Sequence, residues 1–173
     1  MERADVVVVA AGPGPRVEVG APIVIAADGG LDRALALGLD VAVVVGDLDS
    51  ASPRGLAEAE ARGARMVRHP TRKDATDLEL ALDEAAALGA TRILVVASAE
   101  GRLDHLLGSV LLLASDRYAS IEIDALVGSA TLHVIRGARR LAGEPGEVLS
   151  LFPLAGPARI TTDGLEYPLT GEV

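Results

Sequence analysis

Acidic motifs stand at four places in this sequence, and each leads into a segment with the pattern of a helix. They read ADGG at residues 27–30, GDLDS at 46–50, KDATD at 73–77 and GRLDH at 101–105. Carboxylates spaced two residues apart are natural ligands for a hard divalent cation. Glycines beside them let a polyphosphate approach the backbone. Together the motifs predict a metal-dependent enzyme that handles nucleotide phosphates.

The GDLDS motif follows an apolar run, so its carboxylates are expected at the end of a strand. Asp47 and Asp49 could turn toward one Mg²⁺ ion, which needs few carboxylates besides water and substrate phosphate oxygens. Ser50 completes the motif as a candidate nucleotide-binding residue. Taken alone, the motif could also be an ordinary acidic turn.

The ADGG motif also follows a strand-like run. Asp28 could orient a water molecule or a ribose, and Gly29 and Gly30 open a helix whose first amides favour an anion. The alternative is that Asp28 only caps this helix before a tight turn. Either reading places the motif where a strand ends and a helix begins.

The KDATD motif places a lysine, a hydroxyl and two carboxylates at one helix start, supplied by Lys73, Thr76, Asp74 and Asp77. Asp74 could be the N-cap, with Asp77 three residues later as in a capping box. The group could instead complete a metal and phosphate site at the carboxyl edge of a parallel sheet, where open α/β folds bind ligands.

The GRLDH motif follows another strand-like run. Arg102 could clamp a phosphate, and Asp104 and His105 begin the next helix. The alternative is a capped helix with a solvated arginine and a structural histidine. Since three motifs lie just beyond predicted strands and the fourth starts a helix, all four can meet at one sheet edge.

Composition excludes several classes of protein. The net charge of −9 and the aromatic content of 2% argue against a nucleic-acid binder, which needs cationic or stacking surfaces. The sequence has no cysteine, so disulfides and thiolate metal sites are impossible. No apolar run has the length of a membrane span, and the first residues lack a signal-peptide pattern, so we expect a cytoplasmic protein without membrane contact.

Apolar runs rich in Val and Ile alternate with helix-like segments in the first part of the chain, which predicts an α/β fold with a Rossmann-like, mostly parallel sheet. Residues 103–114 are apolar almost all round, so we expect that helix to be deeply buried. The strands are predicted at 5–10, 23–26, 41–45, 65–67 and 92–97, and the helices at 30–37, 53–62, 76–88 and 103–114.

The pattern changes near Asp124, where short strand-like pieces separated by Gly and Pro turns begin. They lie at 130–135, 147–152 and 158–162 and predict a small antiparallel β domain, a partial sandwich. We therefore expect a nucleotide-binding catalytic domain over residues 1–124 and a small β domain over 125–173. The β domain is too small to cover its own apolar side chains, so we expect a homodimer joined through it. These side chains are Val134, Ile135, Leu149, Leu151 and Phe152.

In the order and spacing of its four motifs, the chain resembles the thiamin pyrophosphokinase family, whose signatures read approximately ADGG, GDxDS, DxTD and GGRxDH. Residues 160–169, ITTDGLEYPL, are also similar to the TxGLxYPL run of that family's β domain. The resemblance implies transfer of diphosphate from ATP to the hydroxyl of thiamin, with Mg²⁺ as cofactor. It also implies a homodimer that binds thiamin between its subunits.

The resemblance assigns roles to residues one by one. Asp47, Asp49 and Asp77 match the family's metal and phosphate carboxylates, and Arg102 joins them as a catalytic candidate. The remaining candidates, for binding the nucleotide, are Asp28, Gly29, Gly30, Ser50, Lys73, Asp74, Thr76, Asp104 and His105.

The chain departs from the family's pattern in three places. Only residues 12–22, rich in Gly and Pro, are available where the family has a helix between its first two strands. Glu100 replaces a usual glycine before GRLDH, and the β domain is expected to be incomplete relative to the family. Two alternatives stay open: a diphosphokinase for another hydroxymethyl heterocycle such as a pterin, and a non-catalytic nucleotide-binding protein of the same fold.

Overall fold

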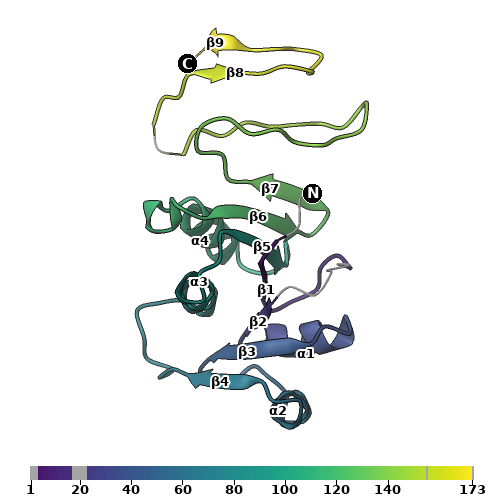
Figure 1. Cartoon of the computed structure of the whole chain (residues 1–173), viewed down its shortest axis with the longest axis vertical. Helices are drawn as coiled ribbons and strands as arrows, with labels where there is room; N and C mark the ends of the chain where they lie inside the picture. The colour runs from purple at the N-terminus through teal and green to yellow at the C-terminus, as the bar shows by residue number, and fades with distance from the viewer. Residues whose placement is uncertain (1–3, 17–22, 155, 173) are drawn as a thin grey trace. The chain divides into compact units, whose positions relative to one another are not determined.

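A computed structural model describes residues 4–16, 23–154 and 156–172. The chain forms two compact units, Met1–Arg140 and Leu141–Val173. Figure 1 shows the elements of each unit. The first unit holds the large sheet and all four acidic motifs, so it is the unit that positions the candidate site.

The large sheet has seven strands in the order β4-β3-β2-β1-β5-β6-β7. The first six in this order run parallel, and β7 is antiparallel to β6. The central strands are continuous Val and Ile runs because both of their faces are buried. This confirms the predicted fold class. The strands are β1 Val6–Val9, β2 Ile23–Ala27, β3 Val41–Gly46, β4 Arg65–Arg68, β5 Arg92–Ala97, β6 Glu122–Val127 and β7 Ala130–His133.

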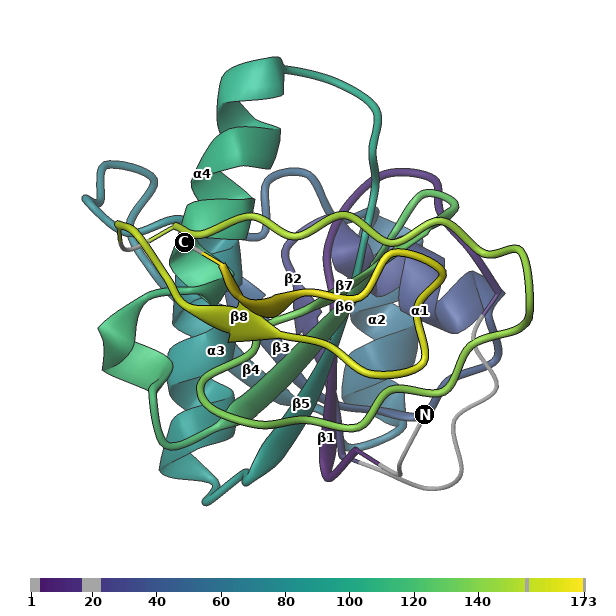
Figure 2. The same ribbon diagram turned by 90° about the horizontal axis from the view of Figure 1, so that it is seen from above.

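Helices cover both faces of this sheet, as Figures 1 and 2 show from two directions. One face packs against α1 (Gly30–Ala36) and α2 (Pro53–Ala61), and the other against α3 (Asp77–Ala87) and α4 (Leu103–Leu113). Alternate residues of each strand point to the two faces, so the sheet supports two separate apolar layers. All four helices were predicted near these bounds.

The strand order reverses between β1 and β5. The strands β2, β3 and β4 follow on one side of this pair, and β6 and β7 follow on the other. In an open α/β sheet the helices leave opposite faces at such a point and leave a crevice at the carboxyl ends of the strands. The fold therefore predicts a ligand site beyond the ends of β1 and β5.

The prediction that α4 is deeply buried is wrong. Among its residues only Leu113 is buried, whereas Leu103, Leu107 and Leu111 are 68%, 54% and 58% exposed. These three leucines recur every four residues and so form one stripe along the helix. A helix on the surface of a sheet can bury only one stripe, and the second apolar stripe of α4 faces away from the core.

The strand predicted at 130–135 belongs to the large sheet and not to the small β region. Val127 pairs with Ala130, so only Gly128 and Ser129 form the turn between β6 and β7. Gly128 has a φ of 59°, which glycine adopts without strain. A two-residue turn folds the chain directly back, and this holds β7 beside β6.

The second unit contains a two-stranded antiparallel sheet formed by β8 (Ile160–Thr161) and β9 (Thr170–Glu172). The strand predicted over 158–162 is confirmed at residues 160 and 161. The strand predicted over 147–152 does not form, because no other described segment pairs with it and a strand needs a hydrogen-bonded neighbour. The domain boundary that we predicted at residue 124 stays a prediction.

The connection between β1 and β2 has no helix over residues 12–16. The rest of the segment 12–22, which we predicted to be too broken for a crossover helix, lies outside the described residues. None of the helices in the described part of the chain is long and apolar enough to cross a membrane.

Candidate functional site

The turn after β2 brings α1 unusually close to β1. A side chain at Gly30 would collide with the carbonyl of Val9, so this position requires glycine. Asp28 has a φ of 45°, a left-handed conformation that is uncommon outside glycine. The N-cap of α1 is Gly29, so Asp28 does not cap the helix. Its carboxylate is buried and accepts a hydrogen bond from the backbone N–H of Ser50 at 3.3 Å.

The loop after β3 curls through a second left-handed residue. Leu48 has a φ of 63° and is buried in the layer that α1 and α2 cover. Asp47 and Asp49 flank it, and Asp49 accepts a hydrogen bond from the Ser50 hydroxyl at 3.0 Å. The curled backbone allows the two carboxylates to turn to the same side of the loop, as the sequence predicted.

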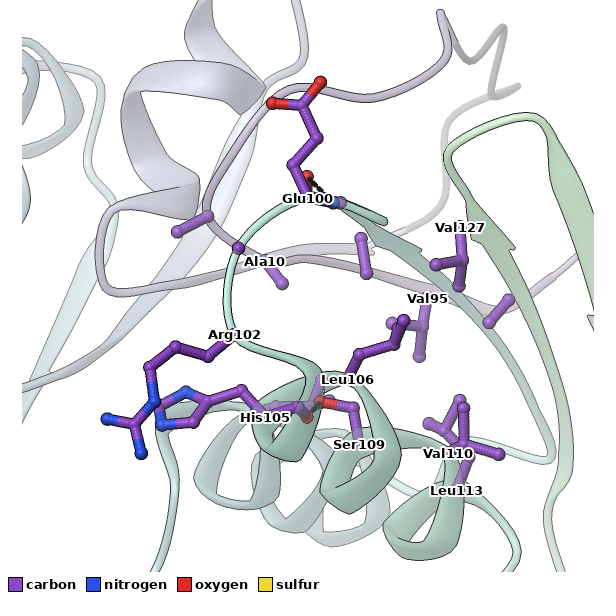
Figure 3. A pocket seen from close by; sticks show the side chains of 16 residues that line it. Ala10, Val95, Glu100, Arg102, His105, Leu106, Ser109, Val110, Leu113 and Val127 are labelled. Carbon is purple, nitrogen blue, oxygen red and sulfur yellow. Dashed lines mark hydrogen bonds between the residues drawn. The ribbon is translucent and has the colours of Figure 1, made fainter.

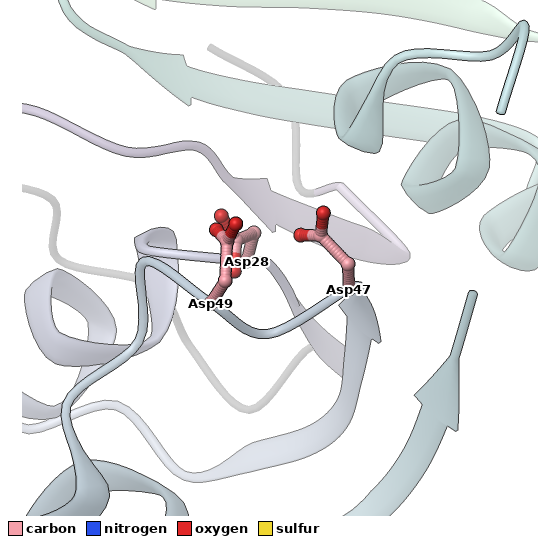
Figure 4. Close-up of side chains that lie close together, drawn as sticks. All are labelled: Asp28, Asp47 and Asp49. Carbon is pink, nitrogen blue, oxygen red and sulfur yellow. The ribbon is translucent and has the colours of Figure 1, made fainter. Parts of the chain in front are cut away.

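Asp28, Asp47 and Asp49 form one acidic cluster, shown in Figure 4. One oxygen from each carboxylate lies within 4.8 Å of the others. Asp28 is buried, Asp47 is half-buried and Asp49 is exposed, so the cluster opens to solvent on one side. Three hard oxygen donors with open access fit an ion such as Mg²⁺, which keeps several waters and takes further oxygens from a substrate.

Lys73 lies beside the acidic cluster. Its Nζ is 3.0 Å from Asp77 Oδ1 and 3.7 Å from Asp47 Oδ2. Burial alone would lower the pKa of Lys73, but the hydrogen bond to Asp77 and the charges of Asp47 and Asp28 outweigh it and raise the pKa. Lys73 is therefore a fixed cation that partly neutralises the carboxylates.

Asp77 is linked to the acidic cluster by its ion pair with Lys73. We predicted it as a metal ligand beside Asp47 and Asp49, whereas the cluster contains Asp28 in that place. Asp77 Oδ1 is near the backbone of Gly46, where an added Cβ would lie 2.8 Å away. Asp77 is thus adjacent to the cluster, and its role as a ligand stays a prediction.

The capping residue of α3 is not Asp74, the residue that the alternative interpretation of the KDATD motif offered. Thr76 is the N-cap, and its hydroxyl accepts a hydrogen bond from the backbone N–H of Glu79 at 3.2 Å. Asp74 lies two residues earlier and is exposed, so the alternative of a capping box formed by Asp74 and Asp77 does not hold. Threonine is among the preferred N-cap residues, and the Asp77 side chain pairs with Lys73.

The GRLDH motif forms a separate charged group at the start of α4. Arg102 donates hydrogen bonds to both carboxylate oxygens of Asp104, and this pairing raises the pKa of Arg102 and lowers that of Asp104. Both side chains are mostly exposed. His105 is also exposed and lines a cavity.

A cavity of about 280 Å³ lies between α4 and the carboxyl ends of β1 and β5, as Figure 3 shows. Arg102 and His105 stand at one end of it, and the side chains deeper in the cavity are apolar. The candidate site thus has two parts at one sheet edge: the acidic cluster near β2 and β3, and the cavity near β1 and β5.

Sequence reasoning missed two residues of α1 that support this edge. Asp32 accepts hydrogen bonds from the backbone N–H and the hydroxyl of Ser52, at 2.8 Å and 2.5 Å, and so ties α1 to the start of α2. Arg33 donates to the carbonyls of Ala10 and Val96, both at 3.4 Å. Their position directly after ADGG was the available signal, because a charged pair in the first turns of a short buried helix needs partners.

Two models of known protein families match most of the chain. The family model of the thiamin pyrophosphokinase catalytic domain matches residues 16–124, and that of the thiamin pyrophosphokinase vitamin B1 binding domain matches residues 132–173. A search of curated proteins finds no significant match.

Several solved structures share the fold. Thiamine pyrophosphokinase from Bacillus subtilis is 29% identical, with a TM-score of 0.60 over 70% of this chain and 59% of its own. A thiamin pyrophosphokinase family protein from Enterococcus faecalis is 28% identical, with a TM-score of 0.61 over 72% of this chain and 61% of its own. Yeast thiamin pyrophosphokinase, at 13% identity and a TM-score of 0.54, matches 73% of this chain and 60% of its own and shows likeness of fold alone.

The chain spans 59% and 61% of the length of the two bacterial structures. The catalytic-domain match by itself covers more than half of the sequence and contains the four acidic motifs. The chain therefore belongs to the thiamin pyrophosphokinase family.

Proposed function

We propose that this chain transfers diphosphate from ATP to the hydroxyl of thiamin, giving thiamin diphosphate and AMP. The observation that supports this most directly is the acidic cluster of Asp28, Asp47 and Asp49 beside the fixed cation Lys73. Carboxylates that bind a metal, and a lysine that binds phosphate oxygens, are the groups that phosphoryl-type transfer requires.

In the proposed reaction the hydroxyl oxygen of thiamin bonds to the β-phosphorus of ATP. The bond from that phosphorus to the oxygen bridging the α-phosphorus breaks, AMP leaves, and the hydroxyl proton passes to solvent. Catalysis of this kind depends mainly on positioning and on neutralising charge. The protein therefore needs to hold the reactants and balance their negative charge.

Asp28, Asp47 and Asp49 would hold the Mg²⁺ ion, with Asp77 as a further candidate. When bound, the ion supplies Lewis-acid neutralisation of the phosphate oxygens. Lys73 keeps Asp77 and Asp47 in place and offers a cation beside the cluster. Arg102, which pairs with Asp104, is the proposed phosphate contact from α4. The other nucleotide-binding candidates are Gly29, Gly30, Ser50, Asp74, Thr76, Asp104 and His105.

The metal assignment is tested by removing single carboxylates. Asp47→Asn and Asp49→Asn should each lower the diphosphate-transfer rate by about 10²-fold or more, because one ligand of the ion is lost. Binding of ATP in the presence of Mg²⁺, measured by titration calorimetry, should weaken in parallel. Asp40→Asn is the matched control, since Asp40 is exposed at the opposite end of β3. Unchanged Mg²⁺ dependence in both site variants would reject the assignment.

We also propose that the protein is a homodimer. Several large apolar side chains of the second unit are exposed, among them Phe152 at 79%, Tyr167 at 80% and Val148 at 94%. Exposed apolar groups gathered in one short segment favour association. Light scattering at micromolar concentration should give twice the chain mass, and Phe152→Ser should shift the protein toward monomer. A wild-type monomer would reject the proposal.

A cytoplasmic location stays a prediction.

A further inference from the structure

Lys73 is the only lysine in the sequence, although Lys and Arg together number 16. Its side chain is 14% exposed, and its Nζ lies 3.0 Å from Asp77 Oδ1 and 3.7 Å from Asp47 Oδ2. An ammonium is a compact point charge on a flexible stem, whereas a guanidinium is a flat fork that binds carboxylates in one fixed geometry. The charge of Lys73 is therefore permanent, but its position can change when a new partner is offered.

The carboxylates beside Lys73 depend on it for compensation of their charge. Asp47 is 11% exposed, and Asp77 Oδ1 is shielded from water. Within the described part of the chain, Asp77 Oδ1 has no hydrogen-bond partner apart from its ion pair with Lys73. It lies against Gly46, where an added Cβ would be only 2.8 Å away. Because a shielded carboxylate without a cation or donor is costly, the ammonium compensates this charge when no metal is bound.

Asp47 is shared between two cations. It contacts Lys73, and it also belongs to the acidic cluster with Asp28 and Asp49, which Figure 4 shows. A divalent cation held by Asp47 and the ammonium of Lys73 would lie within a few ångströms of each other. Like charges at such a separation repel strongly where the surroundings are half-buried and poorly screened. The ion and the ammonium therefore compete for the charge of the same carboxylate.

We propose that Lys73 is an internal competitor of the divalent cation, which weakens binding of the ion alone and couples its binding to that of a polyphosphate. The inference rests on the proposed function for the identity of the site. Phosphate oxygens offer the ammonium strong charge-assisted hydrogen bonds in place of those to the carboxylates. Once paired with phosphate, Lys73 no longer opposes the ion, so each ligand favours binding of the other. Lys73 is thus a positioning residue for both ligands.

The variants remove the charge of Lys73 or move its loss to a neighbouring position. Lys73→Met removes the ammonium and keeps an unbranched side chain of similar length. Arg72→Met is the matched control, since it removes one positive charge at the preceding residue, which is exposed. Lys73→Arg keeps the charge. Lys73→Gln, which retains a hydrogen-bond donor, replaces Lys73→Met in the comparison if that variant does not fold.

Two titrations of each variant separate the ligands, with Mn²⁺ and inorganic tripolyphosphate as probes. In calorimetry with Mn²⁺ alone, Lys73→Met should bind the ion about tenfold or more tightly than the wild-type chain. In saturating Mn²⁺, the same variant should bind tripolyphosphate about tenfold more weakly. Arg72→Met should change either affinity by less than about threefold. Lys73→Arg should bind Mn²⁺ alone as weakly as the wild-type chain.

The effect of Mn²⁺ on thermal unfolding provides a second measurement. The ion should raise the melting temperature of Lys73→Met more than that of the wild-type chain, since tighter binding to the folded state stabilises it further. A residue that only supported the fold would weaken both ligands when it is replaced. Changes of opposite sign for Mn²⁺ and tripolyphosphate therefore distinguish competition from a structural role.

Three results would overturn the proposal: Mn²⁺ binding that is unchanged or weaker in Lys73→Met, tripolyphosphate binding that is not weakened, or equal effects in Arg72→Met. Absence of Mn²⁺ binding in both the wild-type chain and Lys73→Met would overturn it as well. The proposed function fails separately. A wild-type chain that shows the opposite changes but transfers no diphosphate from ATP to thiamin would reject that function and leave the role of Lys73 intact.

Discussion

The helices α3 and α4 have the same length and cover the same face of the sheet, yet they are held very differently. Helix α3 buries Leu78, Ala81, Leu82 and Ala85, and its acidic residues are half-buried. Helix α4 is more apolar in sequence, but only Leu113 is buried. The number of apolar residues therefore does not decide how firmly a helix packs. A clear division into an apolar and a polar face does, because only one face can meet the core.

The starts of the two helices differ in the same way. Helix α3 begins with a Thr76 cap and with Asp77 paired to Lys73 inside the site. Helix α4 has Arg102 at its N-cap position without a side-chain capping hydrogen bond, and the charged pair of Arg102 with Asp104 is exposed. The start of the firmly packed helix thus supplies one fixed carboxylate, that of Asp77, beside the acidic cluster. The loosely packed helix forms one wall of the cavity.

The largest expected effect distinguishes the buried stripe of α3 from the outer stripe of α4. Leu82→Ala should lower the free energy of unfolding by about 2–5 kcal/mol, since Leu82 is fully buried and leaves a cavity. Leu111→Ala, at an exposed position of α4, should stay within about 0.5 kcal/mol. Denaturant unfolding of both variants measures the difference. Equal losses would show that α4 packs as firmly as α3.

The next effect compares the charged residues at the two helix starts. Lys73→Met leaves the carboxylates of Asp77 and Asp47 without their cation and should destabilise the fold by about 1–3 kcal/mol. Arg102→Met removes an exposed pair with Asp104 and should change stability by less than about 1 kcal/mol. Thermal unfolding at low ionic strength compares the two. A larger loss for Arg102→Met would contradict the view that the charged pair at the start of α3 is the more firmly held of the two.

A smaller effect is expected for the hydrogen bond between Tyr118 and α3. Tyr118 is buried and donates a hydrogen bond to Asp83 of α3 at 2.9 Å. Tyr118→Phe should cost about 1 kcal/mol. Burial, with Asp83 nearby, raises the pKa of Tyr118, so the folded chain keeps a proton that the unfolded chain loses above about pH 10. Wild-type stability should therefore fall above that pH, and in Tyr118→Phe this fall should be smaller. An identical alkaline profile would contradict this.

The smallest effect concerns the outer stripe of α4 alone. Leu107→Gln replaces a side chain that is 54% exposed and should change stability by no more than about 0.5 kcal/mol. Denaturant unfolding at two protein concentrations provides the check. A loss of stability above about 1 kcal/mol that depends on protein concentration would contradict the view that the outer stripe of α4 is free. It would show that another chain covers α4 in solution.

Much of the first unit could be predicted because its signals are local. Continuous Val and Ile runs identify buried parallel strands, and Ser52 before Pro53 marks the start of α2 in both sequence and structure. The burial of α4 could not be predicted, because a pattern apolar on all sides does not say which side meets the sheet. The segment 147–152 has the pattern of a strand, but a strand exists only when another segment pairs with it.

The residues that belong to the site could be predicted from the sequence, but the contacts between their side chains could not. The sequence placed Asp47 and Asp49 together because they are neighbours in one loop. The approach of Asp28 depends on two left-handed residues, and the pairing of Asp77 with Lys73 depends on Thr76 taking the cap. These are tertiary and backbone choices, and single-sequence patterns do not contain them. Arg33 was missed for the same reason, since its partners are carbonyls of distant strands.

Leu48 is subject to two demands that no single side chain can satisfy. Its left-handed backbone would prefer glycine by about 1–2 kcal/mol. Its buried side chain fills a place in the core, and truncating such a leucine costs about 2–5 kcal/mol. Selection for stability alone would remove such a conflict, for example by shifting the loop so that the leucine adopts ordinary dihedrals. That shift would separate the carboxylates on either side, so efforts to make this protein more heat-resistant should leave residues 46–50 untouched and gain stability elsewhere.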